Sequence, residues 1–398
     1  MKILIIDEEF PYPLNTGKRI RSFNLLSRIA RNNAVTYLAY GTESTESFEA
    51  LKKAGLNPVA VPPHVPTKSG PLFYFRLLGN LLSRHPYIVT SHYSKVFAER
   101  LHEMIARERP DIIICEWTPY AIFVRDIFGP KKVIVAHNIE HRIWRRYYEN
   151  EANFLKKWYI ARQMGKVERF EKESFSAVDG ATAVSEIEAE QIRGINPACI
   201  VAVVDNGVDP EYYNLPDVPE NKNLVFVGSM NWRPNQDAIN YFVHDIFPLI
   251  REKDKKITVT FVGQDPPEVI RKLGRLPGIS VADNVTDVRP YVQNAAVSIV
   301  PLRIGGGSRL KILEAFAMRK AVVSTTVGAE GLEVANEKHL LLADTAKSFA
   351  EAILRLMNDS ELRRNLGESG RQLAVEKYSW DILAEKLQRF LDKLMERQ

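Results

Sequence analysis

Short apolar runs rich in β-branched residues alternate along the chain with segments of helical periodicity. Continuous rather than alternating apolar runs indicate parallel strands that are covered on both faces. The predicted strands cover residues 2–6, 35–39, 58–61, 111–115, 132–136, 181–184, 200–204, 224–227, 256–262, 278–282, 297–301, 321–324 and 339–342. The predicted helices include residues 17–32, 235–251, 287–294, 308–318, 346–357, 360–376 and 380–396. This alternation predicts an α/β fold with doubly wound sheets.

A turn-rich stretch near residues 205–222 divides the two series of strands. We therefore expect two Rossmann-like domains, residues 1–205 and residues 206–378. In open α/β sheets, ligands bind at the carboxyl ends of the strands. Two such domains that face each other form a cleft, and this cleft is the expected ligand site.

The composition excludes several classes of protein. Hydrophobic residues make up 45% and charged residues 26% of the 398 residues, which excludes collagen-like, coiled-coil and disordered chains. The net charge of +5 suits an anionic small ligand or a membrane surface as well as it suits nucleic acid. The two cysteines, Cys115 and Cys199, are too few for a disulfide framework or a cysteine zinc cluster. They favour a reducing cytoplasm.

The first residues resemble no signal peptide, because a short apolar run meets Asp7 at once. No apolar stretch approaches the ~18 residues of a membrane-spanning helix. We expect a soluble cytoplasmic chain whose contact with a membrane, if any, is peripheral.

The segment richest in candidate chemistry is residues 301–317, where a strand leads through three glycines into a helix. Glycines let the backbone approach a ligand closely, and a helix N-terminus offers free N–H groups and a positive dipole end. Arg309 and Lys311 add two cations near that helix start, although cations there oppose the helix dipole. A diphosphate between the cations and the loop explains their presence. Glu314, on the same helix, is placed to accept hydrogen bonds from sugar or ribose hydroxyls.

An ordinary loop with surface charges is the alternative interpretation of this segment. The third glycine of the dinucleotide fingerprint is missing after Gly305 and Gly307, where Leu310 stands, and no P-loop motif occurs in the chain. The sequence therefore argues against a dehydrogenase and against a P-loop NTPase.

The segment GGGSRLKILEAFAMRKAVVSTTVGAEGL, at residues 305–332, resembles the donor-site signature of glycosyltransferase family 4. The resemblance extends along the whole chain in order and spacing. It includes the motifs PLNTGKRIRSF, AHNIEHR, NGVD, VGSMNWRPN, VTDVRPYVQNA and YSWDILAEKL. The resemblance implies a GT-B fold in which a terminal helix, residues 379–398, returns to the first domain. It also implies transfer of a sugar from a nucleotide-diphosphate sugar to an acceptor hydroxyl with retention of anomeric configuration.

The chain departs from the family pattern at two places. Family members typically have two glutamates eight positions apart, and here Gly306 replaces the first while Glu314 is the second. Many members carry Arg and Lys after the first strand of the second domain, where this chain has Ser229 and Asn235. We infer that Arg309 and Lys311 neutralise the diphosphate instead.

His137 begins an H-x-x-E-H pattern that ends at His141, which is the inverted zinc-protease signature. Zinc chemistry needs both histidines on one helix face, but His137 directly follows a predicted strand. By resemblance, His137 faces the reacting sugar, and a purely structural histidine is the alternative. Gly17 opens the first helix, where backbone N–H groups could meet the diphosphate or simply begin a helix.

The resemblance and the residues together give one set of site predictions. The predicted catalytic residues are His137, Arg309, Lys311 and Glu314. The predicted donor-binding residues are Gly17, Gly228, Arg233, Val285, Gly305, Gly306, Gly307 and Ser308. We expect no metal, because Arg309, Lys311 and helix dipoles can stabilise the leaving group. We expect no cofactor beyond the donor substrate and no nucleic-acid partner.

Two segments and two alternative functions stay open at this stage. Residues 142–172 interleave basic, aromatic and acidic residues, so they form either a surface for anionic lipid or a solvated helix face. Residues 70–82 are unusually apolar for a connection, and they either cover an acceptor groove or join the core. A nucleotide-sugar epimerase on the same fold and a non-catalytic nucleotide-sugar-binding protein are the alternative functions.

Overall fold

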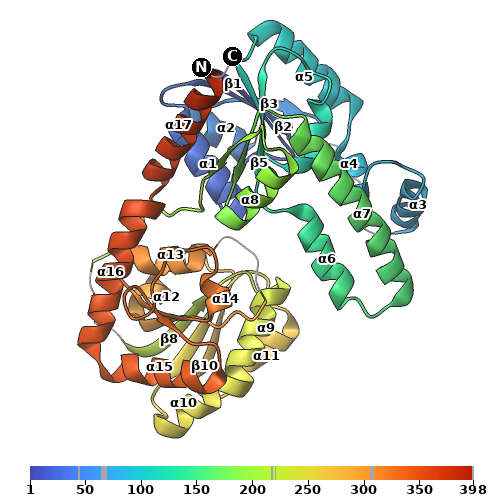
Figure 1. Ribbon diagram of the computed structural model, residues 1–398. Helices are drawn as coiled ribbons and strands as arrows, with labels where there is room; N and C mark the ends of the chain where they lie inside the picture. Colours follow the sequence, from blue (N-terminus) through green and yellow to red (C-terminus); the bar gives the residue numbers. More distant parts are fainter. Residues whose placement is uncertain (44, 64–69, 217, 220, 305–308, 397–398) are drawn as a thin grey trace. The chain divides into compact units, whose positions relative to one another are not determined.

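Each of two units is built around one parallel sheet (Figure 1). The computed structural model describes residues 1–43, 45–63, 70–216, 218–219, 221–304 and 309–396. The first unit comprises Met1–Asp205 and Leu383–Gln398, and the second comprises Asn206–Ile382. The division between Asp205 and Asn206 lies where the turn-rich stretch begins. Most of the terminal helix belongs to the first unit.

The described part of the first unit holds a seven-stranded parallel sheet in the order β3-β2-β1-β4-β5-β6-β7. Its strands are β1 (Lys2–Asp7), β2 (Ala34–Tyr40), β3 (Asn57–Val61), β4 (Ile112–Cys115), β5 (Lys131–Ala136), β6 (Gly180–Ala183) and β7 (Ile200–Val203). Its helices are α1 (Gly17–Ile29), α2 (Glu46–Lys53), α3 (Pro71–Asn80), α4 (Tyr87–His92), α5 (Lys95–Glu108), η1 (Thr118–Phe123), α6 (Glu140–Asn150), α7 (Phe154–Ser176), α8 (Glu186–Ile195) and α17 (Trp380–Glu396).

The described part of the second unit holds a six-stranded parallel sheet in the order β10-β9-β8-β11-β12-β13. Its strands are β8 (Asn221–Val227), β9 (Thr258–Gly263), β10 (Ile279–Asp283), β11 (Ala295–Val300), β12 (Ala321–Ser324) and β13 (Leu341–Leu342). Its helices are α9 (Arg233–Tyr241), η2 (Phe242–Ile246), α10 (Phe247–Lys253), α11 (Glu268–Leu273), α12 (Arg289–Asn294), α13 (Leu310–Ala317), α14 (Thr326–Ala329), α15 (Ala346–Asn358) and α16 (Ser360–Tyr378).

Each predicted strand has a counterpart in the structure, and the predicted α/β class with doubly wound sheets is confirmed. The single helix predicted over residues 235–251 is wrong. It divides into α9, one π-helical segment and α10. Pro248, near the start of α10, has no N–H to donate to a carbonyl one turn earlier, and this interrupts regular α-helical bonding.

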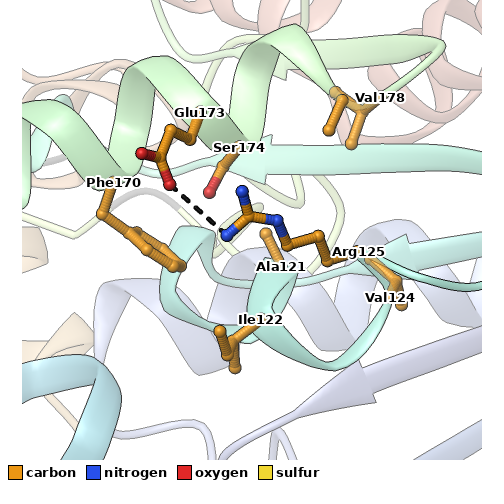
Figure 2. Close-up of a pocket in the computed structure, with 9 residues that line it drawn as sticks. Ala121, Ile122, Val124, Arg125, Phe170, Glu173, Ser174 and Val178 are labelled. Atoms are coloured by element: carbon orange, nitrogen blue, oxygen red, sulfur yellow. Dashed lines mark ion pairs between the residues drawn. The ribbon is translucent and has the colours of Figure 1, made fainter. Parts of the chain in front are cut away.

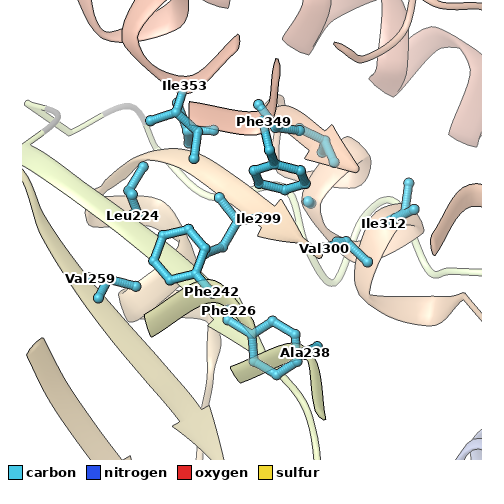
Figure 3. Packing of buried hydrophobic residues seen from close by; sticks show 14 of the residues in the cluster. Leu224, Phe226, Ala238, Phe242, Val259, Ile299, Val300, Ile312, Phe349 and Ile353 are labelled. Carbon is cyan, nitrogen blue, oxygen red and sulfur yellow. The ribbon is translucent and has the colours of Figure 1, made fainter. Parts of the chain in front are cut away.

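Buried side chains cover both faces of the second sheet (Figure 3). Phe226 and Leu224 of β8 and Ile299 of β11 lie in one cluster with residues of α9, α13 and α15. Burial of each such side chain contributes about 1.5–3 kcal/mol to folding. This packing explains why the strands of the sequence are continuous apolar runs.

The order of the strands reverses direction at one point in each sheet. In the first sheet the reversal lies between β1 and β4, and in the second it lies between β8 and β11. Because all strands of a sheet run parallel, their carboxyl ends share one edge, and the loops that follow diverge at the reversal. The segments that follow these four strands are therefore the expected sites for ligands.

Helix α17 lies against the first unit beside α1 (Figure 1). Gln388 accepts a hydrogen bond from Asn33 at 2.7 Å, and the Lys386 ammonium lies 3.2 Å from the Asp205 carboxylate. The Phe390 ring fills the space beside Gly180 of β6, where a Cβ atom would lie 2.8 Å from it. These contacts hold residues after Leu383 on the first unit.

Helix α7 is fixed to the first unit by its C-terminal half. Phe170 and Ser174 line a shallow pocket with residues of η1, and Glu173 lies 3.4 Å from Arg125 (Figure 2). In the described ranges, we find no helix with the length and apolar character that crossing a bilayer requires.

The ends of β8 and β9 approach each other closely at Gly263, the last residue of β9. A Cβ atom there would lie 2.0 Å from the Gly228 carbonyl oxygen, which is backbone and cannot swing away. We expect Gly263→Ala to destabilise the protein by about 1–3 kcal/mol through overpacking. Thermal unfolding measures this change. Gly165→Ala in α7, where no atom lies within 4 Å of the added Cβ, is the matched control and should stabilise by ~0.5–1 kcal/mol. Equal midpoints for the two variants would contradict the prediction.

Candidate functional site

The carboxyl ends of β8 and β11 bring a lysine, an amide and a glycine together in the second unit. Lys311, in the first turn of α13, donates a hydrogen bond to Asn235 Oδ1 at 2.8 Å. Asn235 is buried, and its Nδ2 donates to the Ser229 carbonyl at 2.7 Å, which fixes the amide with its oxygen toward Lys311. A Cβ atom on Gly228 would lie 2.8 Å from Asn235 Nδ2 and 3.0 Å from Lys311 Nζ. The space above Gly228 is therefore occupied by these two side chains.

The side chain of Lys311 is partly buried. Its Nζ lies 4.2 Å from the centroid of the Phe226 ring. Burial lowers the pKa of Lys311 to about 7, and the charge of Arg309 acts in the same direction. Glu314, on the next turn of α13, only partly opposes this shift. Within the described residues, no carboxylate oxygen lies within 4 Å of Lys311 Nζ to form an ion pair.

Arg309 lies directly before α13 in a left-handed backbone conformation, with φ of 53°. Non-glycine residues in this conformation cost free energy and are common at functional sites. The buried guanidinium donates to the Glu330 carbonyl oxygen at 3.0 Å and to its carboxylate at 3.0 Å. Glu330 follows α14, so the start of α13 is tied to the segment after β12.

Glu314 lies one turn after Lys311 on α13. It accepts a hydrogen bond from the Tyr213 hydroxyl at 2.9 Å. Burial raises the pKa of Glu314, and burial together with the charge of Glu314 raises the pKa of Tyr213. Tyr213 therefore remains a hydrogen-bond donor at neutral pH. One carboxylate oxygen of Glu314 is committed to it.

The other predicted residues of the second unit differ in their surroundings. Arg233 is exposed at the first position of α9. Val285 is partly buried and packs against a small apolar cluster that includes Val225 and Val262. Gly305, Gly306, Gly307 and Ser308 lie outside the described residues.

The first unit has its own polar group at the strand reversal. Glu116 follows β4 and is buried, and its Oε1 accepts a hydrogen bond from Ser22 of α1 at 2.5 Å. His137 follows β5, and its Nε2 lies 3.4 Å from the same oxygen. Burial acts to raise the pKa of Glu116, but His137 and Ser22 outweigh it and the pKa lies below the usual value. Burial lowers the pKa of His137, so its ring is neutral at pH 7.

The start of α1 carries charges of both signs. Lys18, the residue after Gly17, has its Nζ 2.6 Å from Asp7 and 2.9 Å from Glu8. Burial raises the pKa of Asp7 to about 6, although Lys18 opposes the shift. Gly17 is the first residue of the helix, and the Thr16 hydroxyl accepts from the Arg19 amide as its cap. Because carboxylates lie beside this helix start, it is a weaker anion site than the start of α13.

The two histidines of the H-x-x-E-H pattern have separate partners. His141 Nδ1 lies 2.8 Å from the buried Glu171, which also accepts the backbone amides of Glu140 and His141. His137 lies next to Glu116 instead. Over the described ranges, no group of three or more His, Cys, Asp or Glu residues is arranged to hold a metal ion.

Two family models match the chain in succession. The model described as "Glycosyltransferase Family 4" matches residues 49–212, and the model described as "Glycosyl transferases group 1" matches residues 221–359. The chain belongs to glycosyltransferase family 4. The two matches cover most of each unit of this glycosyltransferase, and both sheets with their site residues lie largely within them.

The chain is also similar to three curated relatives, two of which are named as glycosyltransferases. An uncharacterised 44.6 kDa protein in the cps region of Klebsiella pneumoniae is 22% identical over 89% of this chain and 90% of its own length. An uncharacterised glycosyltransferase of Methanocaldococcus jannaschii is 32% identical over 45% of this chain and 50% of its own. The capsular polysaccharide biosynthesis glycosyltransferase CapM of Staphylococcus aureus is 29% identical over 28% of this chain and 30% of its own.

Solved structures show the same fold. Sucrose-phosphate synthase of Thermosynechococcus elongatus has a TM-score of 0.71 at 17% identity over the full length of both chains. Anabaena HepE, solved in complex with UDP-glucose, has a TM-score of 0.69 at 14% identity over 99% of this chain and 100% of its own. The GT-B fold predicted for this glycosyltransferase is confirmed.

The structure places Lys311 and Glu314 one turn apart on α13, with Arg309 directly before that helix, and places His137 in the other unit. Sequence reasoning did not nominate four of the residues that contact these side chains. They are Asn235, Tyr213, Glu330 and Glu116. Asn235 and Glu330 lie within motifs that carry the family resemblance, so these motifs could have indicated both residues as members of the site. No local pattern points to Tyr213 or Glu116, because only the fold brings them to their partners.

The pair of Glu116 and His137 can be tested by titration. In the native protein we expect the pKa of His137 to lie below 6.5. Removing the charge in Glu116→Gln should lower it further, because Glu116 stabilises the protonated ring. NMR titration of the labelled histidine rings measures this shift. Glu171→Gln, which removes the partner of His141, is the control and should leave His137 unchanged. An unchanged or higher pKa of His137 in Glu116→Gln would contradict the pairing.

Proposed function

We propose that this glycosyltransferase moves a sugar from a nucleotide-diphosphate sugar to an acceptor hydroxyl with retention of anomeric configuration. The observation that carries the proposal is Lys311, a partly buried cation whose polar partner is a neutral amide. A cation withdrawn from water needs a compensating charge. A bound diphosphate supplies that charge at the start of α13.

The position of the site supports a diphosphate as ligand. Lys311 and Arg309 follow β11, at the strand reversal where ligands of parallel sheets bind. The first N–H groups of α13 have no partner within the helix, and free N–H groups at a helix N-terminus favour a bound anion. Anabaena HepE, which shares the fold, binds UDP-glucose, and this favours a sugar nucleotide of that kind here.

We assign a role to each predicted residue on this basis. Arg309 and Lys311 bind the diphosphate, and Glu314 accepts hydrogen bonds from hydroxyls of the sugar or ribose through its carboxylate. Backbone groups at Gly228 and in the segment Gly305–Ser308 contact the donor. Arg233, Val285 and Gly17 contribute further donor contacts. His137 acts at the sugar being transferred, where a neutral ring can bond a hydroxyl and its carbonyl can stabilise positive charge.

The proposed reaction uses the leaving diphosphate itself. The bond between the anomeric carbon and the diphosphate oxygen breaks, and the acceptor oxygen forms a bond to that carbon on the same face. The acceptor proton passes to the departing phosphate oxygen. Arg309 and Lys311 stabilise the charge that develops on the diphosphate, which is the role a divalent metal has in other enzymes. The reaction as proposed needs neither a covalent carboxylate nucleophile nor a metal.

The acceptor is proposed to be a sugar, a glycolipid or another hydroxyl compound of glycan or polysaccharide biosynthesis. Two relatives favour this: one is encoded in a cps region, and CapM is a capsular polysaccharide biosynthesis glycosyltransferase. An epimerase would turn over the nucleotide sugar without any acceptor. A non-catalytic protein would bind the nucleotide sugar and leave it unchanged.

The first test combines binding with turnover. UDP, GDP, ADP and their sugars are screened by thermal shift, because a ligand of the native state raises the melting temperature. With the donor so found, Arg309→Ala and Lys311→Ala should each lower turnover at least ~100-fold. Glu314→Gln should mainly weaken donor affinity. EDTA should not change turnover, and the product should keep the donor's anomeric configuration.

Arg275→Ala, which removes an exposed cation elsewhere in the second unit, is the matched control and should keep normal turnover. Near-normal activity of both Arg309→Ala and Lys311→Ala would place the diphosphate elsewhere. Turnover in the absence of acceptor would favour the epimerase.

The second test follows the proton on Lys311. Its pKa of about 7 leaves it mostly neutral at pH 8, whereas a bound diphosphate favours the charged form. Binding of the nucleotide sugar at pH 8 should therefore take up about 0.9 proton, and at pH 6 only ~0.1. Calorimetry in buffers of different ionisation enthalpy measures this uptake. Lys311→Arg keeps the charge at all pH values, so it should bind the donor without uptake at pH 8. Equal uptake by the two proteins would show that another group takes the proton.

A further inference from the structure

Helix α3 presents large apolar side chains to solvent along almost its whole length. Its exposed residues are Leu72, Tyr74, Phe75 and Leu78, and the exposed Leu82 follows the helix. Phe75 is 72% exposed and Leu82 is 94% exposed. Among the ten residues of α3, Asn80 is the one that is buried. The alternative that residues 70–82 join the core is therefore wrong, because most of the large apolar side chains of this segment are exposed to solvent.

The exposed helix is nevertheless fixed in place. Gln163 of α7 donates to Asn80 Oδ1 at 2.9 Å, and both side chains are buried. Lys166 of α7 donates to the carbonyl oxygens of Asn80 at 2.6 Å and Leu81 at 3.2 Å. Figure 1 shows α3 beside α7 at the edge of the first unit. Because hydrogen bonds to α7 hold its C-terminal end, α3 has a fixed position in which its apolar side chains face the solvent.

The N-terminal half of α7 continues the same kind of surface. Phe154 and Leu155 are exposed, and Trp158 is partly so. Residues three or four positions apart share one helix face, so Leu155, Trp158 and Arg162 lead along α7 toward Lys166, which touches α3. We call the exposed residues of 72–82 and 154–162 the α3–α7 surface.

The charges on the two segments of the α3–α7 surface have one sign. Residues 72–82 contain Arg76, and residues 154–162 contain Lys156, Lys157 and Arg162; neither segment contains an acidic residue. Arg84, just after the surface, is paired with Glu173. Arg162 lies 5.7 Å from the centroid of the Trp158 ring, and Lys157 lies 4.9 Å from that of Tyr148. Cations beside exposed aromatic rings match a layer of anionic headgroups above an apolar interior.

We propose that the α3–α7 surface binds the surface of an anionic phospholipid bilayer. The side chains of Phe75, Leu78 and Leu82 enter the boundary between headgroups and acyl chains, and Lys156 and Lys157 contact lipid phosphates. A second copy of the chain fits this surface poorly, because a symmetric interface would place the same cations against each other. The proposal does not depend on donor binding, and no part of its test uses the nucleotide sugar.

Vesicle flotation with the full chain tests the proposal. We expect binding to vesicles of phosphatidylglycerol and phosphatidylcholine, weak binding to phosphatidylcholine alone, and loss of binding as salt rises. Lys156→Gln/Lys157→Gln should lower the partition coefficient roughly 30-fold, as the loss of two cations at an anionic surface predicts. Phe75→Ser/Leu78→Ser should lower it at least ~10-fold through lost apolar contact.

Matched controls come from other exposed surfaces. Lys255→Gln/Lys256→Gln removes a neighbouring lysine pair from the second unit, and Phe128→Ser removes a phenylalanine that is 90% exposed. Both controls should bind vesicles as the unchanged protein does, and all variants should keep its melting temperature. Absence of binding to anionic vesicles at low salt would overturn the proposal. So would equal losses in the controls, or a change of oligomeric state in Phe75→Ser/Leu78→Ser with vesicle binding intact.

Discussion

Parallel pairing of the strands is the constraint on which the rest of this molecule depends. In a parallel sheet every strand ends at the same edge, so residues that follow β8 and β11 meet although about 70 residues separate them in the chain. The same geometry brings Glu116 and His137 together after β4 and β5 in the first unit. The apolar strands provide the stability, and the polar chemistry collects where they end. A glycosyltransferase of this fold can therefore vary its edge residues without changing its cores.

The charge balance within the second unit is uneven in a way that indicates a ligand. Several cations described there have carboxylate partners, as Arg303 has Asp237 and Arg309 has Glu330. Lys311 instead contacts the Phe226 ring and the Asn235 amide, and burial together with the charge of Arg309 lowers its pKa to about 7. Such an arrangement is costly in the empty protein and favourable once an anion arrives. The family's usual cations after β8 are absent here, and Asn235 fixes Lys311 from that position instead.

The first unit combines a rigid polar edge with an apolar surface that has no covering element among the described residues. Burial and a hydrogen bond hold Ser22 and Glu116 at the edge, and His137 Nε2 lies 3.4 Å from Glu116. At the far side of α7, buried bonds from Gln163 and Lys166 hold α3 so that its aromatic and leucine side chains point outward. These polar contacts and the packing of Phe73 against Tyr87 fix α3, because its exposed apolar residues contribute little to folding. Such exposed apolar side chains are favourable when a lipid bilayer covers them, as proposed above.

The sequence alone determined the class of fold, the family and the positions of the thirteen strands found among the described residues. It did so because continuous apolar runs, glycine-rich loops and helix periodicity are local properties that follow directly from side-chain chemistry. Arg309, Lys311 and Glu314 could be proposed as site residues for the same reason, since one helix start carries all three. Their partners could not. Asn235, Tyr213 and Glu330 are separated from them by 76, 101 and 21 positions of the chain. The apolar residues 70–82 were equally compatible with a place in the core, and the sequence could not show that they are exposed. Packing between distant elements leaves the apolar residues of α3 exposed and places an amide beside Lys311. Only the tertiary structure decides such packing.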